Sequence, residues 1–357
     1  MTGRRLLPDS ETARVGSHRA AARLVVRILL IALAVHLLLP QLAGLEASGR
    51  ALARARRWWL LPLALGLEAA SLLAYAELVR TVLRAVGQPV ARGLAQRVTV
   101  AGYALGRTLP GGSVAALAVV ATELRGVGLP AATTAAAITA SGLLSAVVLA
   151  LLLPAGVVLA LLAGEGAGIA FGVAGLAVLV VIAGLAARPT LQRPRALGRL
   201  AERSAAVIAR GPLRRRLDPV ELGGQVTEAT KGLGELAGRP VLLGRAGGWA
   251  TANWLLDLAV LVAIAATLGP GVPLWGLPLA YVLGQWTASV PLTPGGVGLV
   301  EPAMTAALVA AGVPAAVATA SVLGWRLVSN WLPIGVGYAL LATLRGGHAR
   351  QRRVRAT

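Results

Sequence analysis

Long runs of apolar residues alternate along the chain with short polar segments rich in arginine. A helix needs about 20 apolar residues to cross the hydrocarbon core of a bilayer. The clearest runs of about that length cover residues 24–45, 58–79, 131–153, 169–187, 249–268 and 315–344. The pattern therefore predicts an all-α polytopic membrane protein with about six full transmembrane helices.

Two further apolar stretches, residues 95–127 and 276–311, are interrupted by proline and glycine. Both residue types break helices, and broken backbone at membrane depth must be satisfied by surrounding protein or a wet cavity. Each stretch is therefore expected to be either a full span followed by a short helix, or a re-entrant pair of half-helices.

The interrupted stretches contain two copies of one pattern. The first copy reads LPGGSVAALAVVATELRGVGLPAA (residues 109–132), and the second reads TPGGVGLVEPAMTAALVAAGVPAA (residues 293–316). The Pro-Gly-Gly and the Gly-x-Pro-Ala-Ala of the first copy both recur 184 residues later. Because two points match at one offset, we interpret the chain as an internal repeat. A duplicated scaffold that transports nothing is the alternative.

Composition supports a location in lipid. Hydrophobic residues make up 57% of the chain and charged residues only 13%, with a mean hydropathy of +0.75. The formal net charge of +20 comes from arginines in tails and loops beside the apolar runs. The positive-inside rule accounts for this distribution better than a nucleic-acid partner does. We therefore predict a multi-pass protein of the cell membrane that binds no nucleic acid.

The same rule predicts the topology. Arginine-rich segments in the N-terminal tail, in residues 80–97, in residues 188–245 and after residue 344 are placed in the cytoplasm, together with both termini. The two Pro-Gly-Gly copies then enter the membrane from opposite sides, which makes an inverted-topology repeat. Such repeats are typical of secondary transporters, whose discontinuous helices meet near the midplane.

The predicted organisation has five parts. They are a basic cytoplasmic tail (1–23), a first membrane half (24–187), a cytoplasmic loop (188–245), a second membrane half (246–344) and a basic tail (345–357). The loop holds eleven Arg, one Lys and five acidic residues. Residues 213–236 within it are expected to form either a helix on the membrane surface or a solvated connection.

Several kinds of chemistry are disfavoured by the residue types present. The chain has no Cys and only three His, so a cysteine nucleophile is excluded and a metal centre is not expected. We predict no cofactor, no metal and no catalytic residue. The chain is thus expected not to be an enzyme.

The Pro-Gly-Gly elements are candidates for binding an anion. Each precedes an apolar helical run, and a helix N-terminus offers free N–H groups and a positive dipole end. Glycine lets a ligand approach the backbone, so a phosphate would fit. The alternative is a packing turn in which glycine allows close helix contact.

Charged side chains are rare in the second half. Between residues 246 and 325 only Asp257 and Glu301 are charged, and Arg326 follows within a span. Arg326 is expected to pair with one of these acids or to hold a lipid phosphate. Glu68 is the comparable buried acid of the first half. The candidate substrate-binding residues are Pro110, Gly111, Gly112, Asn253, Asp257, Pro294, Gly295, Gly296, Gly298, Glu301 and Arg326.

Residues 289–337 resemble the signature of the lysylphosphatidylglycerol synthase transmembrane (flippase-like) family. That signature has Pro-Gly-Gly-x-Gly-x-x-Glu, then Gly-x-Pro, then an Arg followed by Trp-x-Pro. The matching residues are Pro294, Gly295, Gly296, Gly298, Glu301, Gly312, Pro314, Arg326, Trp331 and Pro333. Residues 249–257 and 109–130 also fit. The first copy departs from relatives, with Gly142 at the position equivalent to Arg326 and Leu117 at that of Glu301.

The resemblance implies a membrane domain that moves an anionic or aminoacylated phospholipid, or a lipid-linked substrate. Bifunctional relatives carry a cytoplasmic synthase domain. This chain ends soon after its last span, so we expect a stand-alone member without synthase activity. An intramembrane lipid-modifying transferase and a non-transporting membrane scaffold are the alternatives.

Overall fold

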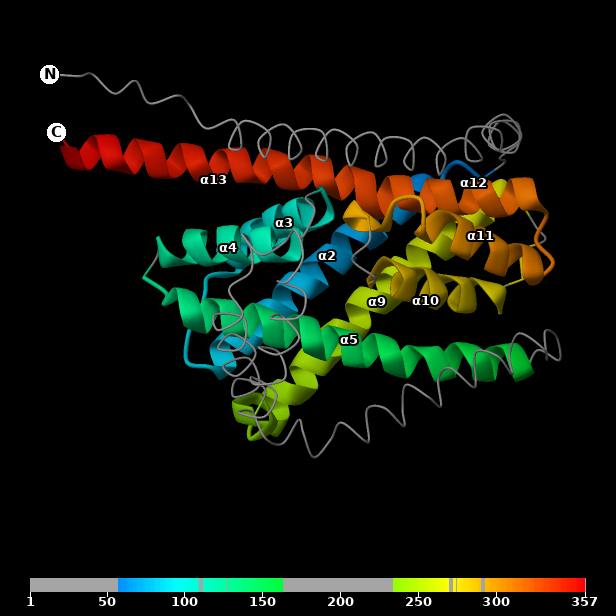
Figure 1. Ribbon diagram of the computed structural model, residues 1–357, viewed down its shortest axis with the longest axis horizontal. Coiled ribbons are helices and arrows are strands. Elements are labelled where there is room, and N and C mark those ends of the chain that lie inside the picture. The colour runs from blue at the N-terminus through cyan, green and yellow to red at the C-terminus, as the bar shows by residue number, and fades with distance from the viewer. Residues whose placement is uncertain are drawn as a thin grey trace, which may run out of the picture.

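The computed structural model describes residues 57–108, 112–126, 128–162, 234–269, 272–273, 275–289 and 293–356. Within these residues the regular structure is helical throughout, as predicted (Figure 1). The elements are α2 (Leu60–Ala85), α3 (Arg92–Thr108), α4 (Gly112–Arg125), α5 (Ala131–Leu162), α9 (Pro240–Leu268), α10 (Gly276–Ser289), η2 (Pro294–Gly296), α11 (Val300–Ala310), α12 (Ala315–Arg326), η3 (Leu327–Trp331) and α13 (Leu332–Ala356).

Four helical stretches in the described part of the chain are long and apolar enough to cross a bilayer. They are Leu60–Ala85, Thr133–Leu152, Pro240–Leu268 and Ala315–Leu344. These stretches overlap four of the six predicted spans, which confirms a multi-pass membrane protein. The other two predicted spans, residues 24–45 and 169–187, lie outside the described residues.

Two helices extend beyond their predicted limits. Helix α9 begins at Pro240, inside the segment predicted as a loop, because proline is well suited to the first turn of a helix. Helix α13 continues to Ala356 through the segment predicted as a tail. Arg245 thus lies within the first turns of α9.

Each interrupted stretch forms two short helices. They contain 17 and 14 residues in the first half, and 14 and 11 residues in the second. At 1.5 Å per residue, helices of 11 to 17 residues span only about 17–26 Å, less than the hydrocarbon core of roughly 30 Å. None of the four is a full span by itself. Their re-entry into the membrane stays a prediction.

The helices of the two halves follow in the same order, and two of the four pairs, α3 with α10 and α5 with α12, begin at the predicted offset of 184 residues. Helices α2, α3, α4 and α5 correspond to α9, α10, α11 and the α12–α13 helix, and Ala131 and Ala315 begin the last pair 184 residues apart. The turns before that pair also match, since Gly128 and Gly312 have φ of 92° and 89°. The direction of each half through a bilayer stays a prediction.

Helices α2 and α9, which correspond to each other, pack side by side through the centre of the molecule (Figure 1). The Ser71 hydroxyl donates to the Asn253 carbonyl at 3.0 Å, and the Asn253 amide donates to the Ser71 carbonyl and hydroxyl at 3.1 and 2.9 Å. The two helices run antiparallel, because Arg80 near the end of α2 lines the same pocket as Arg245 near the start of α9. The hydrogen bonds of Asn253 thus join α9 to α2.

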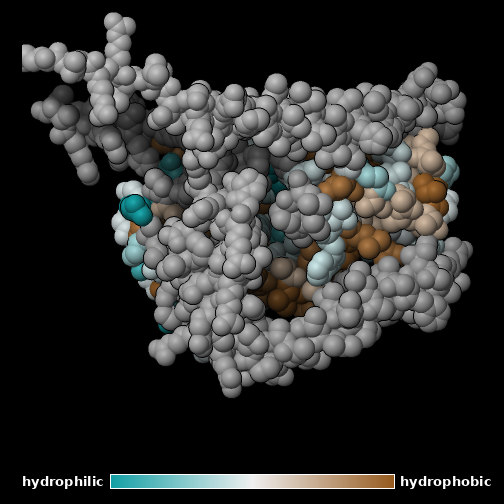
Figure 2. Space-filling model, in the orientation of Figure 1, coloured by the Kyte–Doolittle hydropathy of each residue, from teal (hydrophilic) through white to brown (hydrophobic). Residues whose placement is uncertain are grey.

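Apolar side chains cover much of the outer surface. Figure 2 shows brown, apolar surface at the middle and right of one face and teal, hydrophilic surface at its left end. Exposed large apolar side chains on α2 and α5 include Leu63, Leu65, Leu73, Val147 and Leu151. In a membrane these side chains face lipid tails, so their exposure needs no protein partner.

Candidate functional site

A short π-helical segment, η3, interrupts the long helix of the second half directly after Arg326. Residue 333 is a proline and has no N–H to donate to the Ser329 carbonyl four residues earlier. The Tyr103 hydroxyl donates to that carbonyl at 2.6 Å. A carbonyl that lacks its usual helical donor in one half thus accepts a hydrogen bond from a side chain of the other half.

Arg326 is enclosed by the second Pro-Gly-Gly element and the helix that follows it. Its side chain is only 2% exposed. Its Nε donates to Glu301 Oε1 at 2.8 Å, and its Nη2 donates to the Gly295 carbonyl at 2.9 Å. Of the two predicted roles for Arg326, the described structure has the ion pair, and the partner is Glu301.

The second Pro-Gly-Gly element is a broken helix, as its sequence predicts. Gly295, Gly296 and Gly298 have φ of 62°, 69° and 82°, a left-handed region that favours glycine. Glu301 lies in the first turn of α11, and its Oε2 accepts the Gly298 N–H at 2.7 Å. The Gly298 N–H, one of the groups predicted to bind an anion, therefore already donates its hydrogen bond to a carboxylate of the protein itself.

The second element packs against the first half of the molecule. A Cβ added to Gly295 would lie 2.9 Å from the carbonyl oxygen of Arg107, so the two backbones are in close contact. Arg107 is three residues before Pro110, and Gly112 begins α4. Pro110 and Gly111 themselves lie outside the described residues. The chain entering the first Pro-Gly-Gly therefore lies beside the second.

Asp257 faces the second half and does not pair with Arg326. Its Oδ2 accepts from the Tyr281 hydroxyl at 2.8 Å and the Gln285 amide at 3.0 Å, and its Oδ1 accepts the indole N–H of Trp325 at 2.9 Å. Three neutral donors thus hold this carboxylate in place, so Asp257 has full hydrogen bonding without a cation.

The first half contributes Glu68 and Arg107 to the same region. Glu68 is buried, and its Oε2 accepts from the Ser329 hydroxyl at 2.8 Å. Because α2 and α9 are antiparallel, Glu68 and Asp257 lie on the same side of the Ser71–Asn253 contact. Charged groups from both halves therefore surround one region, which we call the central cluster: Glu68, Arg107, Asp257, Glu301 and Arg326.

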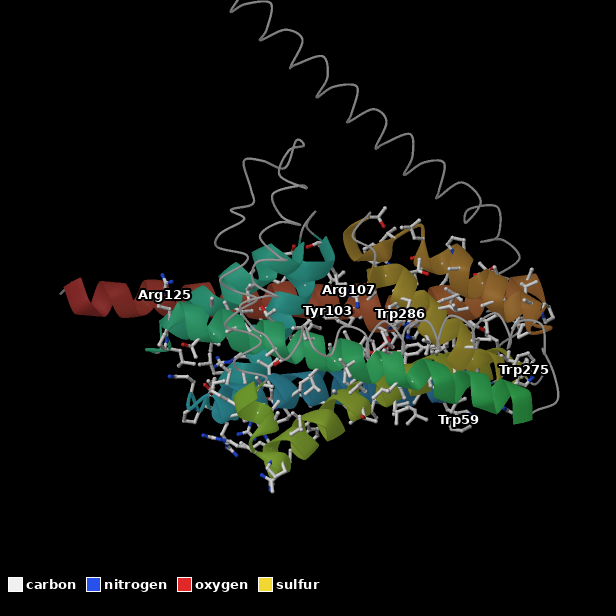
Figure 3. All side chains as sticks on the ribbon, turned by 60° about the horizontal axis from the view of Figure 1, so that its bottom comes forward. Trp59, Tyr103, Arg107, Arg125, Trp275 and Trp286 are labelled. Atoms are coloured by element: carbon white, nitrogen blue, oxygen red, sulfur yellow. The ribbon has the colours of Figure 1, made fainter. Side chains whose placement is uncertain are left out.

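Arg107 is the partly exposed cation of the central cluster. Its guanidinium carbon lies 5.1 Å from the centre of the Tyr103 ring, within the range of a cation–π interaction. Figure 3 shows Tyr103, Arg107 and Trp286 near the middle of the molecule along its length, between Trp59 and Trp275 at one end and Arg125 near the other.

Arg107 and Tyr103 are not among the site residues predicted from the sequence. A signal was present, since Arg107 is the only charged residue between Arg97 and Glu123 and it precedes Pro-Gly-Gly by three residues. Asn330 is recognisable in the sequence as a polar residue within an apolar run. Asn330 is 2% exposed, and neither side-chain polar atom has a hydrogen-bond partner within the described residues.

The two halves differ in the residues that would complete a symmetric site. Leu117 occupies the position equivalent to Glu301, so the first copy has no carboxylate there to occupy its own helix N-terminus. Gly142 occupies the position equivalent to Arg326, and a Cβ added to it would meet no atom within 4 Å. The cations of the central cluster therefore come from nonequivalent positions, 107 and 326.

The comparison with known proteins agrees with the sequence signature. The family model described as "Lysylphosphatidylglycerol synthase TM region" matches residues 24–337, nearly the whole chain. No curated protein matches the chain. The match includes both Pro-Gly-Gly copies and every residue of the central cluster.

Proposed function

The chain belongs to the lysylphosphatidylglycerol synthase transmembrane family, and from this premise we propose that it moves a phospholipid across the cell membrane. The substrate has an anionic or aminoacylated headgroup, or is a related lipid-linked molecule. Both termini lie in the cytoplasm, and the two halves are inserted as an inverted repeat with re-entrant Pro-Gly-Gly helices. The protein acts without changing its substrate chemically.

One observation carries this proposal: a broken-helix element of one half contacts the other half beside buried charges. The Gly295 backbone lies against the Arg107 carbonyl, and the central cluster draws two residues from the first half and three from the second. Buried charges in a membrane are costly and are typical of substrate pathways. A packing turn alone would not need them.

Arg107 is the residue that would meet the headgroup first. It is partly exposed, whereas Arg326 is enclosed by Glu301 and the Gly295 carbonyl. The Arg107 backbone contacts the Gly295 turn, so a phosphate held by the Arg107 side chain would lie within one arginine side-chain length of that turn. The phosphate could then compete with Glu301 for Arg326, since both are oxyanions that accept bidentate hydrogen bonds from arginine.

The first Pro-Gly-Gly copy supports this entry point. Helix α4 begins at Gly112, and Leu117 leaves its N-terminus without the carboxylate that Glu301 supplies to α11. The first turn of α4 thus has no acidic side chain of its own to compete with an incoming anion. The nearby Arg107 adds a positive charge to the same place.

The proposal is tested by reconstituting the full chain in liposomes with fluorescent phospholipids. The panel includes phosphatidylglycerol, lysylphosphatidylglycerol and phosphatidylethanolamine, and movement is followed by quenching of label in the outer leaflet. We expect faster redistribution than in protein-free vesicles for at least one headgroup. Arg107→Gln should slow it by roughly tenfold, as expected for loss of a charge-assisted hydrogen bond.

Arg97→Gln is the matched control, because Arg97 is an exposed arginine on the same helix, outside the central cluster. It should move lipid at the wild-type rate. Lack of movement for every headgroup would rule out transport and leave a scaffold. Covalent conversion of the labelled lipid would instead favour a transferase.

A further inference from the structure

A second charged site lies away from the central cluster, at the end of α2 and the beginning of α9. It is a pocket of about 380 Å³, within the range of about 300–1,000 Å³ typical of small-molecule sites. We call it the arginine pocket. Its charged lining residues are Glu77, Arg80, Arg84, Arg92 and Arg245, with Trp249 beside them.

A buried carboxylate contacts two of the arginines. Glu77 is 5% exposed, and its Oε2 accepts from Arg80 Nε at 2.8 Å and lies 2.7 Å from Arg80 Nη2. Its Oε1 accepts from Arg92 Nε at 2.7 Å. Glu77 thus contacts both guanidinium groups, that of Arg80 with a side chain 21% exposed and that of Arg92 with one 64% exposed. Both retain N–H groups that Glu77 does not use.

The other two arginines of the lining are Arg84 and Arg245. No ion pair is found for Arg84 or Arg245 among the described residues. Four arginines against the single Glu77 carboxylate leave the lining with an excess of three positive charges. A concave surface with this excess attracts an anion that carries more than one negative charge.

The arginine pocket lies at the depth of lipid headgroups. Arg80 follows Trp59 on α2 by 21 residues, which corresponds to about 32 Å, close to the thickness of the hydrocarbon core. Trp59 is 70% exposed at the opposite end, and Trp249 is 37% exposed beside the pocket. Exposed tryptophans at both ends of the span are typical of the two membrane interfaces.

The repeated scaffold does not require this pocket. The positions equivalent to Arg80, Arg84, Arg92 and Arg245 in the other half are Ile264, Leu268, Gly276 and Leu61. The position equivalent to Glu77 is Leu261. One end of the molecule therefore carries four guanidinium groups where the other end is apolar, although the helices correspond.

We propose that the arginine pocket binds a phosphate group with two or more negative charges, supplied by a phosphomonoester lipid headgroup or by a soluble phosphate. Guanidinium groups recognise phosphate through paired N–H donors. The positive-inside rule explains arginines on this side of the membrane. It does not explain a buried glutamate that contacts two of them around a cavity. This binding does not depend on the proposed transport.

The test measures binding to the purified full chain in detergent at low salt. Inorganic pyrophosphate and short-chain phosphatidic acid are the two probes, so a soluble source and a lipid source are distinguished. Arg84→Ala/Arg245→Ala leaves the Glu77 contacts intact and should raise the Kd of the bound probe by roughly tenfold or more. Binding should also weaken steeply as salt increases.

Arg239→Ala is the matched control, because Arg239 is an exposed arginine just before α9 that does not line the pocket. It should leave the Kd within about twofold of wild type, as surface charges generally do. The proposal fails if neither probe binds, or if Arg239→Ala weakens binding as much as the double variant. Failure here would leave lipid movement by the wild-type chain unaffected, so the two proposals are judged separately.

Discussion

Replacement of Arg326 by methionine tests whether the central cluster depends on its buried ion pair. The variant keeps the unbranched inner part of the side chain, with a shorter apolar end, but leaves the Glu301 carboxylate, 8% exposed, without its cation. It also removes the donor to the Gly295 carbonyl. Removing one partner of a buried pair costs about 3–5 kcal/mol. Arg326→Met should therefore be strongly destabilising even though it adds no steric clash.

A second variant separates the lost pair from the unpaired charge. Glu301→Gln/Arg326→Met removes both charges, and the glutamine oxygen still accepts the Gly298 N–H that Glu301 now accepts. Replacing both partners of a buried pair is commonly close to neutral. We expect the double variant to lose less than half of the stability that Arg326→Met loses.

Thermal unfolding in detergent, followed by tryptophan fluorescence, measures the effect. At about 2–4 °C per kcal/mol, as in domains of 150–250 residues, a loss of about 3–5 kcal/mol should lower the Tm of Arg326→Met by roughly 6–20 °C. All variants are heated at one scan rate, because membrane proteins of this size often unfold irreversibly. Arg125→Ala, an exposed site on α4, should change the Tm little.

Two results would refute this reasoning. One is a Tm for Arg326→Met within about 1 °C of wild type, well below the shift that an unpaired buried charge produces. The other is a double variant as unstable as the single variant. Either would mean that Glu301 does not need its cation, and the central cluster would then be more hydrated than its burial indicates.

Two further predictions concern contacts between the halves. A Cβ on Gly337 would lie 2.5 Å from the Val100 carbonyl oxygen, so Gly337→Ala should lower the free energy of unfolding by about 1–3 kcal/mol. Gly335→Ala is the control, because its Cβ meets nothing within 4 Å, and it should be neutral or stabilising. Equal Tm values for the two variants would contradict the close contact at Gly337. Tyr103→Phe removes the donor to the Ser329 carbonyl and should cost about 1–3 kcal/mol in the same assay; an unchanged Tm would show that this carbonyl has another donor.

Much of the fold could be predicted from the sequence, because its signals are local. The length of an apolar run determines whether it can cross a bilayer, so 58–79 and 315–344 were identified as spans without any contact being known. Proline and glycine chemistry is equally local. The turn at Gly295 is broken for the reason its sequence predicts, since only glycine enters the left-handed region easily.

The candidate site was predictable only in part. The sequence identified Asp257, Glu301 and Arg326 as the unusual charges of the second half, because charges within apolar runs are conspicuous. It left open which acid Arg326 pairs with. Spacing along the chain does not settle that choice, because all three residues lie on different helices separated by turns.

The tertiary structure decided the pairings. The packing of the helices places Glu301 beside Arg326, whereas Asp257 accepts hydrogen bonds from neutral donors. It also brings the Arg107 backbone against the second Pro-Gly-Gly turn. The same packing gathers Arg80 and Arg245, far apart in sequence, around one pocket. Hydrophobic length and backbone chemistry belong to each segment, whereas the partner of a charged side chain depends on how separate helices meet.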